Sequence, residues 1–195
     1  MKIEVRQLAG ADLAGRLTDL ARLRIGVFAE YPYLYDGDEG YEAEYLREFA
    51  AAPGAVLVAA FAGGRIVGAA TASPMWAQKA EFREPFERLG HDTSSLFYFG
   101  ESVLLGAFRG HGVGHAFFDR REEAARRAGA GAATFAAVIR PQDHPSRPAD
   151  YRPLDPFWRK RGYEKVEGLV TRLAWKEHGE NGESPKPMQY WMRNL

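Results

Sequence analysis

Cysteine is absent from this 195-residue sequence, and its absence excludes several classes of protein. Without thiols the chain cannot form a disulfide scaffold, bind zinc through thiolates or use a cysteine nucleophile. Long apolar runs are also missing, since the longest, at 55–62, is far shorter than the roughly 20 residues of a membrane helix. The first residues alternate charged and apolar side chains, so we expect no secretory signal peptide and a cytoplasmic location.

An excess of charge of one sign is missing as well. The sequence has 26 lysines and arginines against 26 aspartates and glutamates. A chain without a net positive field is not drawn to nucleic acid or to anionic lipid, so we expect neither partner. With 46% hydrophobic and 27% charged residues, the composition is that of a globular protein, and the length suits a single domain over 1–195.

Hydrophobic periodicity predicts strands mixed with helices along the whole chain. Strands are expected at 3–8, 55–61, 65–73, 95–105, 132–139, 165–175 and 188–192, and helices at 12–28, 38–51, 78–89, 112–128 and 154–161. The glycines at 63 and 64 predict that the second and third strands form a β-hairpin. No repeat or flexible linker indicates a domain boundary.

The most informative stretch is the junction between the strand at 95–105 and the helix at 112–128. Its glycines allow the backbone to approach a ligand closely, and the free N–H groups of the first helical turn attract phosphate. Arg109 adds a charged donor. A P-loop is excluded because the chain contains no Gly-Lys pair, and the dinucleotide motif requires a glycine where His115 stands.

The pattern Arg109-x-x-Gly112-x-Gly114 resembles the pyrophosphate-binding motif of the GNAT superfamily of acyl-CoA-dependent N-acetyltransferases. The order of elements and the segment Phe157-Trp158-Arg159-Lys160-Arg161-Gly162-Tyr163 are similar to that superfamily as well. The resemblance implies an α+β domain with a central mixed, mostly antiparallel sheet of six to seven strands, which splays near 103–105 and carries helices on both faces. It also implies acetyl transfer from acetyl-CoA to a primary amine of a small molecule or peptide, by direct attack in a ternary complex.

The resemblance further implies that backbone groups of Val103 and Leu105 hold the pantetheine arm and that the glycine turn binds the pyrophosphate. The implied cofactor-binding residues are Val103, Leu104, Leu105, Arg109, Gly110, His111, Gly112, Val113 and Gly114. Trp158 stands where many members carry the tyrosine thought to protonate the leaving thiolate, and an indole N–H cannot do so. This departure leaves open a second interpretation, a CoA-binding sensor or assembly subunit without catalysis.

Candidate catalytic residues follow from the needs of the chemistry. An alkylamine with a pKa of about 10 must lose a proton before it attacks, whereas a thiol with a pKa of about 8.5 needs only a weak acid to leave. Glu101 is a carboxylate in an apolar strand and is the candidate base, with pairing to a nearby arginine as the alternative. In the proline-rich loop at 140–153, Tyr151 is the candidate acid, and His144 and Arg147 are candidate substrate contacts; a proline-braced surface loop is the alternative.

Tyrosines and carboxylates gather after the first long helix, where no basic residue occurs from 31 to 46. Aromatic rings beside carboxylates suit a cationic amine, so Tyr33, Tyr35 and Asp36 are candidate acceptor contacts. A solvated acidic helix start with tyrosines packed on the sheet explains the same pattern. The apolar closing strand fits the core or a homodimer contact equally, and no third ligand accompanies His111 and His115, so we expect no metal site.

Overall fold

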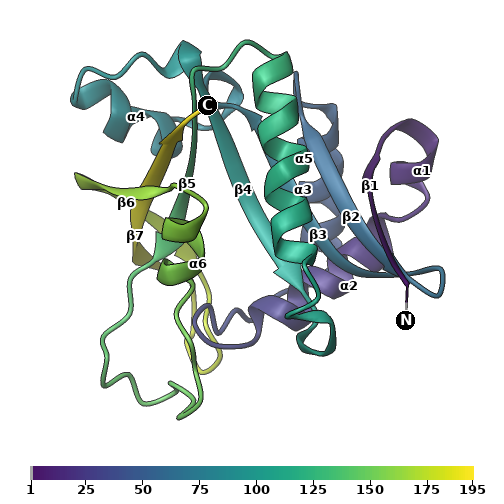
Figure 1. Cartoon of the computed structure of the whole chain (residues 1–195). Helices are drawn as coiled ribbons and strands as arrows, with labels where there is room; N and C mark the ends of the chain where they lie inside the picture. Colours follow the sequence, from purple (N-terminus) through teal and green to yellow (C-terminus); the bar gives the residue numbers. More distant parts are fainter. Residues whose placement is uncertain (1) are drawn as a thin grey trace.

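A seven-stranded sheet runs through the computed structural model, which describes residues 2–195, in the order β1-β2-β3-β4-β5-β7-β6 (Figure 1). The strands are β1 (Ile3–Leu8), β2 (Val56–Ala62), β3 (Arg65–Pro74), β4 (Leu96–Leu104), β5 (Ala132–Val138), β6 (Glu164–Trp175) and β7 (Ser184–Asn194). Neighbouring strands are antiparallel except β4 and β5, which are parallel. This mixed, mostly antiparallel sheet confirms the expected fold class.

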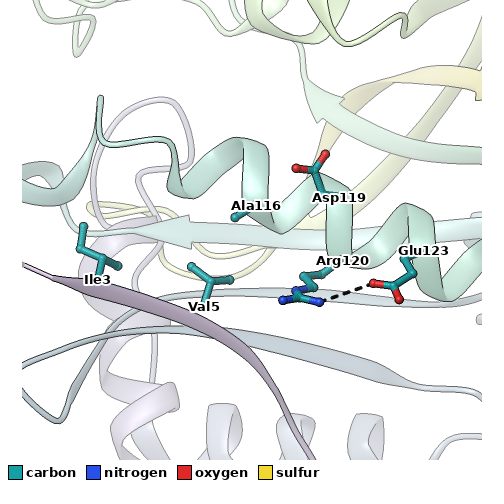
Figure 2. Close-up of a pocket in the computed structure, with 6 residues that line it drawn as sticks. All are labelled: Ile3, Val5, Ala116, Asp119, Arg120 and Glu123. Atoms are coloured by element: carbon teal, nitrogen blue, oxygen red, sulfur yellow. Dashed lines mark ion pairs between the residues drawn. The ribbon is translucent and has the colours of Figure 1, made fainter.

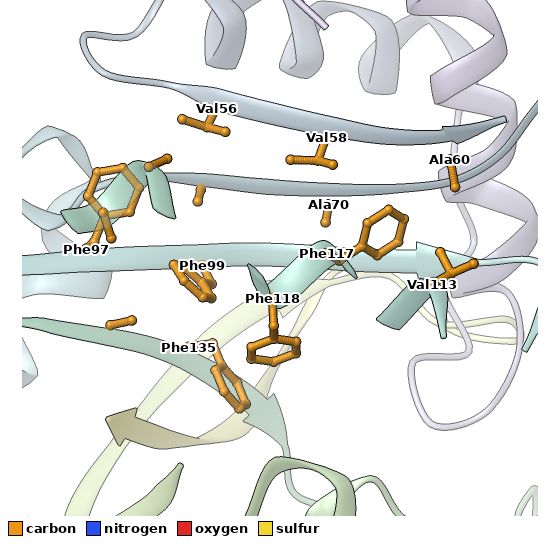
Figure 3. Close-up of a cluster of buried hydrophobic side chains, with 14 of the residues drawn as sticks. Val56, Val58, Ala60, Ala70, Phe97, Phe99, Val113, Phe117, Phe118 and Phe135 are labelled. Atoms are coloured by element: carbon orange, nitrogen blue, oxygen red, sulfur yellow. The ribbon is translucent and has the colours of Figure 1, made fainter. Parts of the chain in front are cut away.

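Helices cover both faces of the sheet, as predicted (Figure 1). They are α1 (Gly10–Ala14), α2 (Leu17–Phe28), α3 (Glu39–Ala51), α4 (Ala80–Arg88), α5 (Val113–Arg127) and α6 (Asp155–Lys160). On one face, rings from α5, β4 and β5 form a core cluster to which α6 contributes (Figure 3). On the other face, α2 and α3 pack against β1, β2 and β3. Because helices cover β2 from both sides, its residues are all buried, which explains why its sequence is continuously apolar.

Two elements differ from the sequence prediction. The helix expected at 12–28 is interrupted at Gly15, which ends α1, and the side chain of Asp12 accepts a hydrogen bond from Arg16 (3.2 Å) across the break. β7 begins before the predicted strand and includes Pro185 and Pro187. These prolines pair with β6 just beyond the last pair of β5 and β7, Val138 with Met188, and the Pro187 carbonyl accepts a hydrogen bond from the Ile139 N–H (2.9 Å). The missing N–H groups therefore remove no bond from the β5–β7 ladder.

Among residues 2–195, none of the helices is both long enough and apolar enough to cross a bilayer.

Candidate functional site

The sheet opens between its two parallel strands. β4 and β5 pair only where Leu96–Tyr98 lies beside Ala132–Thr134, although β4 continues beside β3 and β5 continues beside β7. Beyond Tyr98 the two strands diverge (Figure 1). Ser102 is exposed even though β4 lies in the middle of the sheet. The gap is therefore where the sequence predicted it, but it begins earlier in β4 than the expected 103–105.

The register of β3 and β4 determines which backbone groups face this gap. The Leu105 N–H donates to the carbonyl of Val67 (3.0 Å), and hydrogen-bonded pairs alternate along an antiparallel ladder, so the backbone of Val103 also faces β3. Ser102 and Leu104 therefore direct their N–H and C=O groups toward the gap. The backbone groups of Val103 and Leu105, for which cofactor contacts were expected, thus face β3, because a β-bulge sets the phase of this part of the strand.

That bulge lies at Gly100 and Glu101. Thr71 faces both residues, since its neighbours on β3 are paired with Phe99 and Ser102. The hydroxyl of Thr71 accepts a hydrogen bond from the Glu101 N–H (3.1 Å), and a Cβ on Gly100 would lie 2.4 Å from the same oxygen. A larger residue at this position would therefore force Thr71 to shift, and the bulge turns the Glu101 side chain toward α2 and α3.

The turn that follows β4 lies at the mouth of the gap and presents free backbone N–H groups. Gly110 and Gly112 have φ angles of +79° and +80°, which side chains rarely adopt. Gly112 is the N-cap of α5 and offers no capping side chain. The N–H groups of Val113, Gly114 and His115 have no acceptor within the helix and lie at the positive end of its dipole. The geometry of this turn suits a phosphate group.

Arg109 lies beside the same turn. Its Nε donates to the Leu104 carbonyl (3.2 Å) and its Nη2 to Glu30 (2.8 Å). Both charged side chains are 54% exposed, so the ion pair is weak and Arg109 is free to turn toward an anion. The His111 ring lies 2.9 Å from the Arg109 carbonyl. Sequence reasoning missed Glu30 because no local pattern links it to a residue so distant in the chain.

Glu101 is not an isolated carboxylate. Arg24 of α2 donates to Glu101 and also to Glu42 of α3. The Tyr45 hydroxyl donates to Glu101 (3.3 Å), and the Tyr35 hydroxyl donates to Glu42 (2.8 Å). Only 12% of the Glu101 side chain and 2% of the Glu42 side chain are exposed. One guanidinium is shared by two carboxylates, which leaves this buried group with a formal charge of −1.

The phenols around Glu101 stay protonated at neutral pH. Burial, with smaller contributions from Tyr151 and Glu101, raises the pKa of Tyr33 to about 12. Burial raises the pKa of Tyr35 and of Tyr45 further still. The Tyr35 and Tyr45 hydroxyls therefore act as hydrogen-bond donors and not as bases.

Two predicted site segments meet at Tyr31. Its ring lies edge-on to Tyr151 at 4.7 Å and 5.6 Å from His144, and the Arg147 guanidinium lies over the Tyr151 ring at 5.1 Å. The structure thus brings the proline-rich loop against the tyrosine-rich turn after α2. Tyr31 was not among the predicted contacts, although it begins the aromatic run that indicated an acceptor site.

Asp36 is engaged elsewhere. Its carboxylate pairs with Lys176 (2.7 Å) at the surface, and the hydrogen bond from Lys176 lowers the pKa of Asp36. Trp175 donates from its indole N–H to the Tyr33 carbonyl (3.0 Å), so the end of β6 also holds this turn. The negative charge of Asp36 is therefore compensated within the chain.

Trp158 belongs to the core. Its ring lies 5.0 Å from the ring of Phe135 and 5.1 Å from that of Trp191. The residue that stands in place of the family's tyrosine acid therefore has a packing role. Within residues 2–195, no three or more histidine, aspartate or glutamate side chains are grouped so as to hold a metal ion.

A separate hollow of about 380 Å³ lies between β1 and α5 (Figure 2). It is lined by Ile3, Val5, Ala116, Asp119, Arg120 and Glu123. None of these residues belongs to the gap, the glycine turn or the group around Glu101. This hollow is therefore distinct from the candidate site.

Residues 23–149 match the Acetyltransferase (GNAT) family, and no curated protein matches the chain. Ribosomal-protein-alanine N-acetyltransferase from Brucella melitensis has a similar fold, with a TM-score of 0.65, 14% identity, and coverage of 98% of this chain and 99% of that one.

Two further structures were solved with a ligand. The first is yncA, a putative acetyltransferase from Salmonella typhimurium with its cofactor acetyl-CoA (TM-score 0.63, 11% identity, 99% of this chain and 94% of that one). The second is the PaiA N-acetyltransferase from Thermoplasma acidophilum in complex with coenzyme A (TM-score 0.56, 11% identity, 100% of both chains). At these identities the likeness shows a shared fold.

Proposed function

The chain belongs to the GNAT family of acetyltransferases, and from this membership we propose that it transfers an acetyl group from acetyl-CoA to a primary amine of a small molecule or peptide. The observation that carries the proposal is the gap between β4 and β5 with the glycine turn at its mouth. Two structures with this fold, from S. typhimurium and T. acidophilum, contain acetyl-CoA or CoA, which supports the same ligand here.

The residues at the gap fit the chemistry of acetyl-CoA. Pantetheine contains amide groups, which pair with the backbone of a strand edge that has no neighbouring strand, such as Ser102 and Leu104. The Leu104 carbonyl becomes available when Arg109, which donates to it here, turns toward the pyrophosphate. Pyrophosphate is an anion, which suits the first N–H groups of α5 and the guanidinium of Arg109. Gly112 has a positive φ, which favours glycine at this position. Because glycine has no side chain, nothing from this residue stands between the helix end and a phosphate.

The chain's own residues then manage protons. Acetyl-CoA, when bound, supplies a thioester whose acetyl carbon accepts an amine and whose thiol departs. An alkylamine with a pKa of about 10 is mostly protonated at neutral pH, so a proton acceptor is needed. Glu101 accepts that proton directly or through water, and Arg24 and Tyr45 hold its carboxylate in one orientation. Tyr151 holds a phenolic proton for the departing sulfur.

The charge of the site favours an acceptor that arrives as a cation. Glu42 and Glu101 share one guanidinium, which leaves one negative charge, and the rings of Tyr31 and Tyr33 lie in the neighbouring turn. Carboxylates and aromatic faces together attract an ammonium group. Tyr33 is therefore the proposed acceptor contact of that turn, and His144 and Arg147 are those of the opposite loop.

Release of free CoA thiol in the presence of an amine panel tests this proposal. The panel contains polyamines, aliphatic and aromatic monoamines, short peptides and anionic amino acids. We expect amine-dependent release, fastest with cationic acceptors. Faster release with anionic amines would contradict the acceptor class, and CoA binding without release for any amine would favour a CoA-binding module without catalysis.

A further inference from the structure

Arg24 occupies a junction of three elements. It comes from α2, and its guanidinium donates from Nε to Glu42 on α3 and from Nη1 to Glu101 on β4. Only 8% of Arg24 is exposed, and the rings of Phe28 and Tyr45 lie 5.3 and 4.6 Å from the guanidinium carbon. The planar guanidinium is therefore fixed in direction by two carboxylates and two rings.

Stability alone does not explain this arrangement. Removing ionised groups from water is costly, and a buried ion pair is often no more stable than an apolar pair of similar volume. Here one guanidinium and two carboxylates are enclosed together, and the guanidinium of Arg121 lies on the opposite face of the sheet. Both oxygens of each carboxylate have a partner, because Tyr35 donates to Glu42 and Tyr45 donates to Glu101. Such complete satisfaction indicates carboxylates whose oxygens are held in fixed positions.

We propose that Arg24 is a positioning residue for Glu101, and that Glu42 takes up part of the Arg24 charge so that Glu101 remains able to accept a proton. This inference rests on the proposed role of Glu101 as the base. A carboxylate paired to an arginine alone holds its negative charge firmly and is a poor base, whereas one without any cation is protonated too readily. Sharing one guanidinium between two carboxylates gives Glu101 a weaker cationic partner than an exclusive ion pair would, but a stronger one than none.

The other groups near Glu101 do not provide this balance. Arg121 of α5 donates to the Glu101 carbonyl (3.5 Å) from the opposite face of the sheet; burial lowers its pKa to about 10, so it stays charged at neutral pH. The neighbouring phenols are neutral because burial raises the pKa of each of Tyr33, Tyr45 and Tyr98. Arg24 is thus the cation that contacts the Glu101 carboxylate, and Glu42 is the carboxylate that shares it, whereas Arg121 acts on Glu101 through the backbone and at longer range from the opposite face.

Charge substitutions test the proposal through the pH profile of kcat. In Arg24→Met two carboxylates lose their cation, so we expect the acidic limb of the profile to move up by about one to two pH units. In Glu42→Gln the guanidinium pairs with Glu101 alone, so we expect kcat on the plateau to fall about tenfold while KM for acetyl-CoA is unchanged. In the double variant, the acidic limb should return to a position between Arg24→Met and the wild type.

The same two helices provide a matched control. Arg22 and Glu39 also pair between α2 and α3 (3.0 Å), but their side chains are 62% and 54% exposed. We expect Arg22→Met, Glu39→Gln and their combination to leave the pH profile in place. If Arg24→Met fails to fold, Arg24→Lys keeps the charge without the planar pair of donors, and it should lower kcat with the acidic limb unmoved.

Two results would overturn the proposal: an acidic limb in Arg24→Met that coincides with the wild type, or a double variant whose limb does not move back. A merely structural ion pair predicts either of these, together with lower thermal stability. Failure of the base itself is distinguishable, because Glu101→Gln would then keep wild-type turnover at every pH.

Discussion

The carboxylate of Glu101 illustrates how much of one residue's behaviour is decided by distant neighbours. Its backbone is placed by the Thr71 hydroxyl on β3, and its side chain by Arg24 and Tyr45 from two helices. The sequence indicates that a lone acid in an apolar strand requires a use or a partner. It does not identify the partner, because Arg24 lies 77 positions away and the chain has many arginines.

Replacing Glu101 by glutamine removes the proposed proton acceptor while keeping the size of the side chain. We expect turnover to fall about 10²-fold and its rise with pH to flatten, with acetyl-CoA affinity unchanged because the glycine turn proposed to bind phosphate is intact. Steady-state rates from pH 6 to 9 measure this. Glu44→Gln, at an exposed carboxylate on α3, is the control and should behave as wild type. Unchanged turnover in Glu101→Gln would remove this residue from the mechanism.

Tyr151→Phe removes the proposed acid. Burial raises the pKa of Tyr151, so its phenol holds a proton at the working pH. A thiol leaves with little help, so we expect only about a tenfold loss of kcat. Tyr41→Phe, at a residue that is 60% exposed, should have no effect. Equal turnover in Tyr151→Phe and the parent would exclude the acid role.

At the scale of elements, local patterns predicted most of the fold. β1 has the predicted bounds, and α3 begins after Asp38, whose carboxylate accepts the Tyr41 N–H as a helix cap (2.9 Å). The bulge at Gly100 was not predictable, because it depends on Thr71 of the neighbouring strand. That bulge sets which residues of β4 face the gap, so the sequence predicted that the sheet opens near this point but did not predict that Ser102 and Leu104, and not Val103 and Leu105, direct their backbone groups into it.

Gly100→Ala tests the bulge. The added methyl would lie 2.4 Å from the Thr71 hydroxyl, so we expect a loss of about 1–3 kcal/mol in the free energy of unfolding. Combining it with Thr71→Ala removes the clash, and the double variant should lose less than the sum of the single losses. Urea unfolding measures all three. Gly106→Ala, where nothing lies within 4 Å of a new Cβ, is the control, and additive losses would contradict the steric explanation.

The connection between β6 and β7 carries a pH-dependent contact. Hydrogen bonds from Lys186, from the Glu177 N–H and from Ser184 lower the pKa of Glu180 from 4.5 to about 2. A carboxyl whose pKa is lower in the folded state than in the unfolded state stabilises the fold at pH values above the unfolded pKa. This stabilisation is lost as the pH falls to the folded pKa. We expect Glu180→Gln to melt below the wild type at pH 7, with the difference closing between about pH 4.5 and 2. A constant difference over that range would contradict this assignment.

At the scale of the whole molecule, the sheet consists of two parts joined at one end. β1 to β4 form one part, β5, β7 and β6 form the other, and only Leu96–Tyr98 of β4 pairs with β5. The core cluster of rings from α5, β4 and β5 holds the two parts together on one face (Figure 3). A ligand that bonds the free edge of β4 within this opening binds only the folded state, so its binding must stabilise the whole molecule.

Thermal denaturation with acetyl-CoA, CoA, ATP and NAD in parallel tests whether this opening binds acetyl-CoA. A ligand at 100 times its Kd stabilises by about 2.7 kcal/mol, which for a chain of this length raises the Tm by about 5–10 °C. We expect acetyl-CoA and CoA to produce this shift, and ATP and NAD to produce none. Stabilisation by ATP or NAD alone, or by none of the four, would contradict the assignment of the β4–β5 gap and its glycine turn to acetyl-CoA.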